Sequence, residues 1–166
     1  SINVYCARAT KRKELLRIKR GYYALPERVR SAGTEALFEA ANRLISPSYI
    51  SLLTALSYHG ISSQVPSGVY ESVTHTKSAT LDVEDIQFRY LRLPEKYWFG
   101  FEKIKNFFMA KPEKALCEAV YLMSMGRYAL DVQAINMKKI DIAILSKYLK
   151  RFPKKARKSF DERFNV

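Results

Sequence analysis

The spacing of apolar residues changes within the first 25 residues of the chain. Residues 2–15 carry apolar side chains at a loose helical spacing, with cations on the outer face. Residues 16–25 alternate around Gly21, which permits the positive φ that a tight hairpin needs. We therefore predict a helix followed by a short basic hairpin. Pro26 ends the second strand, because proline donates no hydrogen bond to a ladder.

Helical spacing returns after the hairpin. Residues 28–35 are predicted to be a linker, and the apolar positions that follow predict a helix over 34–45. A second helix is expected to start at Ser46-Pro47, where serine is a good N-cap and proline suits the first helical position. Gly60 is a typical helix end, so this helix is expected to run to that residue.

The middle of the chain predicts strands. Residues 69–76 and 86–93 are rich in β-branched and aromatic side chains and alternate in polarity, and an acidic loop, LDVED, is predicted between them. Further short strands are expected within 99–110. Of the aromatic residues in this region, we expect Phe88, Phe101 and Phe107 in the core. The Tyr97-Trp98 pair is expected in a loop at the surface, available to a protein partner.

Three helices are predicted in the last third of the chain. The first opens at Pro112, with Glu113 in its first turn. An amphipathic helix is expected over 141–152, and a short basic one over 154–164. Together the elements predict an α+β fold with a small, mostly antiparallel sheet packed by helices. No apolar run approaches the roughly 20 residues that span a bilayer.

Charge is unevenly distributed along the chain. Its 29 Lys and Arg and 16 Asp and Glu give a net charge of +13. Residues 8–30 hold nine cations and two acids, a net +7, and residues 138–166 hold ten cations and three acids, also +7. The remaining residues are close to neutral. This pattern indicates one or two surfaces that meet a polyanion, and a lysine-rich proteome is the simpler alternative.

A helix followed by a basic hairpin is the second half of a winged helix-turn-helix. The helix of that motif enters the major groove, and the hairpin, or wing, lies along the phosphates. Residues 1–30 are therefore predicted to be a DNA-binding region, and residues 31–166 a separate domain. Because the two preceding helices are missing, we expect the protein to extend upstream of Ser1. The candidate DNA-binding residues are Asn3, Tyr5, Arg8, Lys11, Arg12, Arg17, Lys19 and Arg20, with Lys154, Lys155, Arg157 and Lys158 in the basic tail.

Catalytic and metal-binding patterns are weak. His59 is interpreted as a helix-end side chain that bonds a free carbonyl, and His75 stands alone. Asp82, Glu84 and Asp85 lie in the predicted acidic loop with no glycine-rich phosphate cradle, so we interpret them as a solvated turn. We expect no enzyme activity, no metal site and no cofactor.

The cysteines and the N-terminus bear on the compartment. Cys6 and Cys117 form no CxxC pair and are predicted as buried thiols in helices. The N-terminal residues contain no apolar segment typical of a secretion signal. A reduced, cytoplasmic setting is the expected one.

Four stretches taken together are similar to a known family. IKRGYYALP, PSYISLLTALSYHGISSQVP, HTKSATLDVEDIQFRYLRL and MAKPEKALCEAVYL resemble the AbiEi-type antitoxins, the antitoxin halves of abortive-infection, type IV toxin–antitoxin pairs. The resemblance covers residues 2–125. It places the wing at residues 17–22, which adds Tyr22 to the DNA-binding candidates. The antitoxin-domain signature falls on Tyr49, Ser51, Tyr58, His59, Gly60, Gln64, Pro66, Pro112, Glu113, Lys114 and Ala115.

The resemblance implies a winged-helix region followed by an α/β antitoxin domain. Members of the family bind DNA repeats in their own promoter, and they oppose a nucleotidyltransferase-like toxin, often without a stable complex. We therefore expect a DNA-binding transcriptional regulator and antitoxin whose partners are double-stranded promoter DNA with an inverted repeat and such a toxin, with no membrane and no small-molecule substrate. The alternatives are a basic, nucleic-acid-associated structural protein without a regulatory role and a degenerate nucleotidyltransferase.

Overall fold

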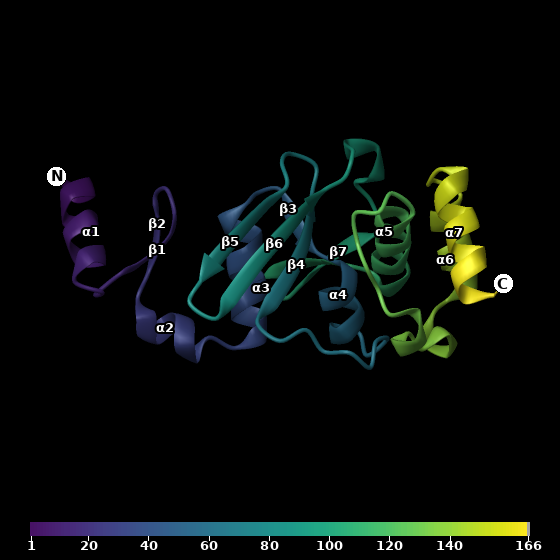
Figure 1. Ribbon diagram of the computed structural model, residues 1–166, viewed down its shortest axis with the longest axis horizontal. Helices are drawn as coiled ribbons and strands as arrows, with labels where there is room; N and C mark the ends of the chain where they lie inside the picture. Colours follow the sequence, from purple (N-terminus) through teal and green to yellow (C-terminus); the bar gives the residue numbers. More distant parts are fainter. Residues whose placement is uncertain (166) are drawn as a thin grey trace.

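The computed structural model describes residues 1–165 and has an α+β architecture (Figure 1). The helices of this part of the chain are α1 (Ile2–Lys11), α2 (Pro26–Ser31), α3 (Thr34–Leu44), α4 (Leu52–Tyr58), α5 (Pro112–Ser124), α6 (Ile142–Leu149) and α7 (Lys154–Phe164). The strands are β1 (Leu16–Lys19), β2 (Tyr22–Ala24), β3 (Ser48–Ile50), β4 (Val69–Thr74), β5 (Ala79–Val83), β6 (Ile86–Arg92), β7 (Phe101–Ile104) and β8 (Phe107–Ala110). Short 3₁₀ turns lie at Glu95–Tyr97, Val132–Ala134 and Met137–Lys139.

Six strands form one mixed sheet in the order β5-β6-β4-β3-β8-β7, and β1 pairs with β2 in a separate hairpin. The sheet is mostly antiparallel, as expected: β4 runs parallel to β6 and β3 parallel to β8, and the other pairings are antiparallel. The short central strand β3 joins the two halves, because it pairs with β4 on one side and β8 on the other.

Helices cover the sheet and extend it at one end. Helix α3 packs against β3, β4 and β8, where the ring of Phe38 meets those of Tyr70 and Phe107 at centroid distances of 6.0 and 5.2 Å. Tyr90 of β6 donates a hydrogen bond from its hydroxyl to the carbonyl of Ala41 at 2.6 Å. Helix α5 contacts α4, α6 and α7, which places the last two helices at the far end of the molecule from α1 (Figure 1).

A buried polar cluster fastens α5 to the sheet. We call Tyr49, Ser51, Lys114 and Glu118 the buried cluster; each is fully buried. The Lys114 ammonium donates to the Glu118 carboxylate at 2.5 Å, to the Tyr49 hydroxyl at 3.0 Å and to the Tyr97 carbonyl at 2.8 Å. The hydroxyls of Tyr49 and Ser51 both donate to Glu118. The pairing satisfies the buried charges, because every ammonium proton and both carboxylate oxygens have partners.

Aromatic rings and a glycine enclose the Lys114 ammonium. It lies 4.5 Å from the ring centroid of Phe99 and 5.3 Å from that of Tyr49. Gly100 has a φ of +72°, and a Cβ there would lie 2.9 Å from the Lys114 side chain. The backbone can therefore pass this close to the aliphatic part of the Lys114 side chain only with glycine at position 100.

The sequence prediction was wrong at two places where strands replace expected elements. Residues 46–51 form no helix, because Ser48–Ile50 pairs with strands far away in the sequence, and α4 begins only at Leu52. The expected acidic loop is mostly strand β5, paired with β6 from Ala79 to Val83. Only the turn at residues 84–85 is left of that loop. Pairing with distant strands determines the structure of both segments, and the local spacing of apolar residues contains no information about that pairing.

Other boundaries also differ from the prediction. Pro26 opens α2, which has Glu27 in its first turn and runs to Ser31, into the linker expected over residues 28–35. Helix α1 ends at Lys11 rather than near residue 15, and Lys13 takes a φ of +60° as the chain turns into the hairpin. No helix of the described residues is both long and apolar enough to cross a membrane.

The aromatic and cysteine expectations are partly confirmed. Phe88 and Phe107 are buried and Phe101 is half-buried. The surface assignment of Tyr97 was wrong: it is 2% exposed and stacks on Phe152 at a centroid distance of 4.6 Å. Phe152 lies between α6 and α7, far from Tyr97 in the sequence, so the sequence around Tyr97 does not reveal this contact. Cys117 is buried, which raises the pKa of its thiol, and Cys6 is only half-buried.

The buried ion pair predicts a stability effect. Lys114→Met leaves the Glu118 carboxylate buried without its cation, so the free energy of unfolding should fall by about 3–5 kcal/mol in urea denaturation. The double variant Lys114→Met with Glu118→Leu removes both charges and should lose clearly less than the sum of the single changes. A single-variant loss below about 1 kcal/mol would mean that the pair does not hold α5 in place.

Candidate functional site

The hairpin at the N-terminal end is the candidate nucleic-acid contact. Strands β1 and β2 pair antiparallel, and the tight turn between them has Gly21 at a φ of +81°, as the sequence predicts. The register shifts between Arg17 and Lys19, a β-bulge that twists the strand. Strand β1 lies beside β5, so the hairpin rests on one edge of the body with its turn free (Figure 1).

The candidate cations of α1 and the hairpin face solvent. Arg8, Lys11, Arg17 and Arg20 are exposed, and Lys19 is half-buried with its ammonium 4.5 Å from the ring centroid of Tyr22. Among the described residues none of these five cations forms an ion pair. These five charges lie within 13 residues and make this end strongly positive, which is the electrostatic condition for binding phosphates.

The other candidates on this end are placed less uniformly. Asn3, Tyr5 and Tyr22 are exposed, and Arg12 pairs with Glu14 at 3.2 Å, which reduces its charge toward a partner. Helix α1 buries only Ala9 among its residues. Its apolar side chains Ile2 and Tyr5 are 80% and 62% exposed. The helix is therefore held by its connection to the hairpin more than by a core of its own.

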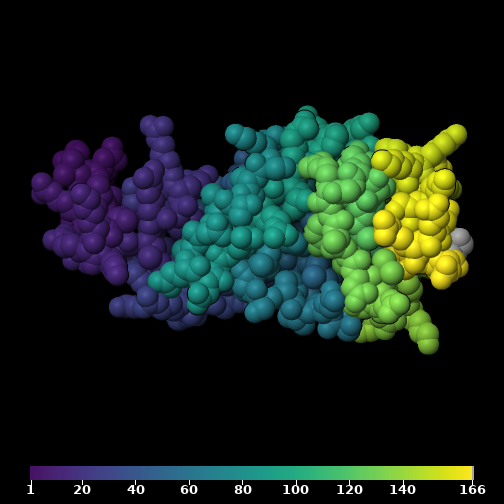
Figure 2. Space-filling model, in the orientation of Figure 1, coloured from purple at the N-terminus to yellow at the C-terminus, as the bar shows by residue number. Residues whose placement is uncertain are grey.

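The basic tail lies at the opposite end of the molecule. Lys154, Lys155 and Lys158 are exposed on α7, and Lys158 pairs with Glu162 at 3.8 Å. Arg157 is half-buried. Figures 1 and 2 place α7 at the opposite end of the long axis from α1 and the hairpin, so the tail is a surface separate from the hairpin, and its contact with DNA stays a prediction. The chain has two separate basic ends.

The signature residues gather inside the body. Tyr49, Ser51 and Lys114 belong to the buried cluster, and Glu113 accepts a hydrogen bond from the Asp141 amide at 3.0 Å. Sequence reasoning missed Glu118, although its position four residues after Lys114 is the helical spacing of an ion pair. These residues stabilise the fold and present no surface to a partner.

The second group of signature residues ties loops together. The His59 imidazole Nε2 lies 2.9 Å from the carbonyl oxygen of Ala110 in β8, so its partner is a strand carbonyl and not a helix carbonyl. The Gly60 carbonyl, in a residue with a φ of +70°, accepts a hydrogen bond from the Lys139 ammonium.

The remaining signature residues make weaker loop contacts. Gln64 donates to Asp131 at 3.3 Å, and Tyr58 donates to Glu35 at 3.3 Å. Pro66 is half-buried beside these loops, and Pro112 opens α5.

Two of the three acidic residues considered for metal binding have other partners. The Glu84 carboxylate pairs with the Arg30 guanidinium at 2.9 Å, and the Asp82 carboxylate accepts a hydrogen bond from the side-chain amide of Gln87 at 2.9 Å. Within the described part of the chain, no group of three ligating side chains gathers.

A second buried carboxyl lies on β4. Glu71 is 5% exposed; its carboxylate accepts from the Tyr128 hydroxyl at 2.6 Å and the Leu53 amide at 3.2 Å, and lies 3.5 Å from Arg89. Burial raises the pKa of Glu71 against the opposing effects of these neighbours. Burial and the nearby carboxylate raise the pKa of the Tyr128 hydroxyl as well. The cluster connects β4, α4 and the chain after α5.

Comparison with known proteins assigns no family. A scan against family models finds no match to this chain, and a search of curated proteins finds none. The functional proposal therefore rests on geometry, charge and the resemblance described above.

The raised pKa of Glu71 predicts a pH dependence of stability. The folded state holds this proton more tightly than the unfolded state, so stability is greatest below the unfolded pKa and falls as the pH rises through the raised one. Glu71→Gln removes the titrating group and should remove this fall. The free energy of unfolding of the variant should therefore rise relative to that of the wild type as the pH increases from 4 to 8, measured by urea denaturation. Glu102→Gln, an exposed carboxyl, is the matched control. Parallel profiles for the wild type and Glu71→Gln would contradict the assignment.

Proposed function

We propose that this protein is a DNA-binding transcriptional regulator and antitoxin that acts in the cytoplasm. Its hairpin end contacts promoter DNA, and the body opposes a nucleotidyltransferase-like toxin. The DNA half follows from charge and shape, and the antitoxin half from the sequence resemblance.

One observation carries the DNA half. A helix and a tight hairpin stand at one end of the molecule with five unpaired cations on their solvent side. An electrostatic surface of this kind neutralises phosphates, and a protruding hairpin fits along a duplex backbone. Asn3 and Tyr5 are both exposed on α1, and such side chains are suited to hydrogen bonds and contacts with base edges. An inverted repeat in the promoter of its own gene is the DNA that the resemblance implies.

The antitoxin half concerns the body of residues 31–166. The buried cluster and the Glu71 cluster give that body a fixed core, and neither is open to a substrate. Buried polar groups that are engaged in holding the fold together suit a protein that acts by binding. This half of the proposal does not require the cations of the hairpin, so the two halves are separable.

Charge reversal of the hairpin tests the DNA half. Lys19→Glu with Arg20→Glu should weaken binding to every duplex alike and reduce the slope of log affinity against log salt by about 2, because each cation is a phosphate contact. Fluorescence anisotropy measures both quantities. Lys154→Glu with Lys155→Glu changes the net charge equally at the opposite end and should leave the affinity almost unchanged. Equal losses in the two variants would show that net charge, and not the hairpin, controls binding.

The same variants separate the two halves in cells. The hairpin variant should lose repression of a promoter reporter and still restore growth to cells that express the toxin of the same operon. Unrelieved growth arrest with the wild-type protein would overturn the antitoxin half and leave the DNA half intact.

A further inference from the structure

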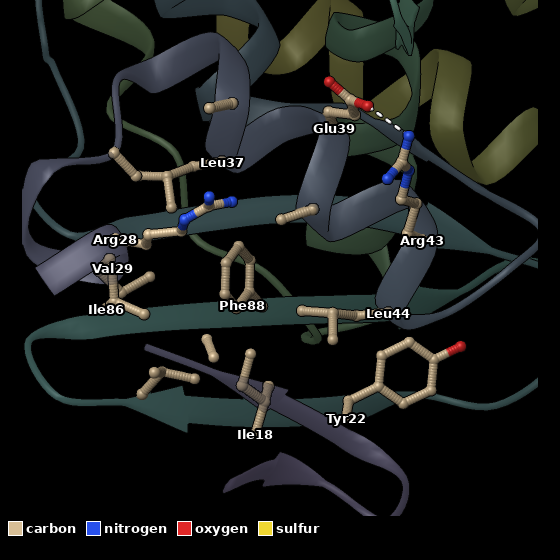
Figure 3. A pocket seen from close by; sticks show the side chains of 15 residues that line it. Ile18, Tyr22, Arg28, Val29, Leu37, Glu39, Arg43, Leu44, Ile86 and Phe88 are labelled. Atoms are coloured by element: carbon tan, nitrogen blue, oxygen red, sulfur yellow. Dashed lines mark ion pairs between the residues drawn. The ribbon is translucent and has the colours of Figure 1, made fainter. Parts of the chain in front are cut away.

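A cavity of about 490 Å³ lies between the hairpin, the helices α2 and α3, and the sheet (Figure 3). Its volume is within the range of small-molecule sites, roughly 300–1,000 Å³. Apolar side chains make up most of the wall, from the hairpin, from both helices and from β5 and β6: Ile18, Ala24, Val29, Ala32, Ala36, Leu37, Ala40, Leu44, Val83, Ile86 and Phe88.

Small side chains explain why the space is open. Four of the wall residues are alanines: Ala24 on the hairpin, Ala32 just after α2, and Ala36 and Ala40 on α3. Ile86 and Phe88 line the cavity from β6, and Ile18 lines it from strand β1 of the hairpin (Figure 3). The hairpin supplies one wall, so the cavity is not part of the core of the body.

Charged groups at the cavity differ in their pairing. Arg43 is bound to Glu39 at 2.6 Å, so this pair is neutral as a unit. Arg28 of α2 extends from beside Val29 over the wall that contains Phe88 (Figure 3). Its guanidinium makes no hydrogen bond or ion pair with any other described residue. The cavity therefore has an apolar interior and one available cation, which is a donor of two parallel hydrogen bonds to a carboxylate.

We propose that this cavity binds a small apolar monocarboxylate. The hydrocarbon part lies against Ile18, Ile86 and Phe88, and the carboxylate pairs with Arg28. Because the ligand touches the hairpin on one side and the body on the other, it fixes the hairpin against the sheet edge. This binding is independent of the DNA proposal and is measured without DNA.

Titration calorimetry with straight-chain acids tests the site. Octanoate should bind saturably, and each added methylene from hexanoate to decanoate should raise the affinity about threefold to fourfold until the cavity is full. 1-Octanol, which lacks the charge, should bind at least about tenfold more weakly than octanoate. Affinities that do not change with chain length, or equal binding of alcohol and acid, would overturn the proposal.

Two variants locate the binding. Arg28→Gln should lower the affinity for octanoate about tenfold and leave that for 1-octanol unchanged. Arg30→Gln removes an equal charge from the same helix at a residue that pairs with Glu84 and does not line the cavity, so octanoate binding should persist. Ala40→Leu fills the space and should abolish binding of both compounds. Because Arg28 is exposed, Arg28→Gln keeps the fold and decides the question even if Ala40→Leu does not fold.

A second copy of the chain is the other candidate occupant. Sedimentation of the ligand-free protein and of the protein with octanoate should show the same state of assembly, because the ligand displaces no second copy. A stable dimer that binds no octanoate would mean that another copy covers the cavity, and would overturn the proposal.

Discussion

The ion pair of Lys114 and Glu118, removed from water, is the contact on which the body depends. It links α5 to β3 through Tyr49 and Ser51, and it holds the chain at Tyr97 by a backbone carbonyl. A charge pair at this depth is tolerated only because its hydrogen bonds are complete. The short strand β3 is held between β4 and β8, and the buried cluster joins it to α5. The sheet and the helical end are therefore linked at this one place.

That anchor separates the molecule into a fixed body and a basic end with little core. The buried cluster lies far from α1, whose residues contribute only Ala9 to the interior. The hairpin rests on the edge strand β5, and the cavity beside it shows that this contact is not closely packed. The cations of the hairpin therefore lie on an element that is packed less closely than the core of the body. The basic tail, at the other end, is a second and separate positive surface.

Sequence reasoning identified the elements that local chemistry determines. Gly21 and the alternation around it predicted the hairpin, and Pro112 predicted the start of α5. It failed at Ser48–Ile50 and at Ala79–Val83, where pairing with distant strands decides the structure. No spacing rule in a single sequence reports such pairings.

The candidate site was predicted in the same uneven way. The hairpin cations were found because charge and exposure are local properties, and most of them are exposed. The roles of Tyr49 and Lys114 were not visible, because their partner Glu118 becomes significant only when α5 packs on β3. The distance between the hairpin and the tail also could not be predicted, since charge along a sequence carries no position in space.

The most direct test of the central claim compares promoter DNA with a scrambled duplex. Fluorescence anisotropy of the protein on both, at a low and a moderate salt concentration, separates base recognition from phosphate attraction. The account predicts a preference for the promoter that persists at the higher salt. Equal binding to the two duplexes, lost together as salt rises, would contradict it and would reduce the hairpin to a non-specific basic surface.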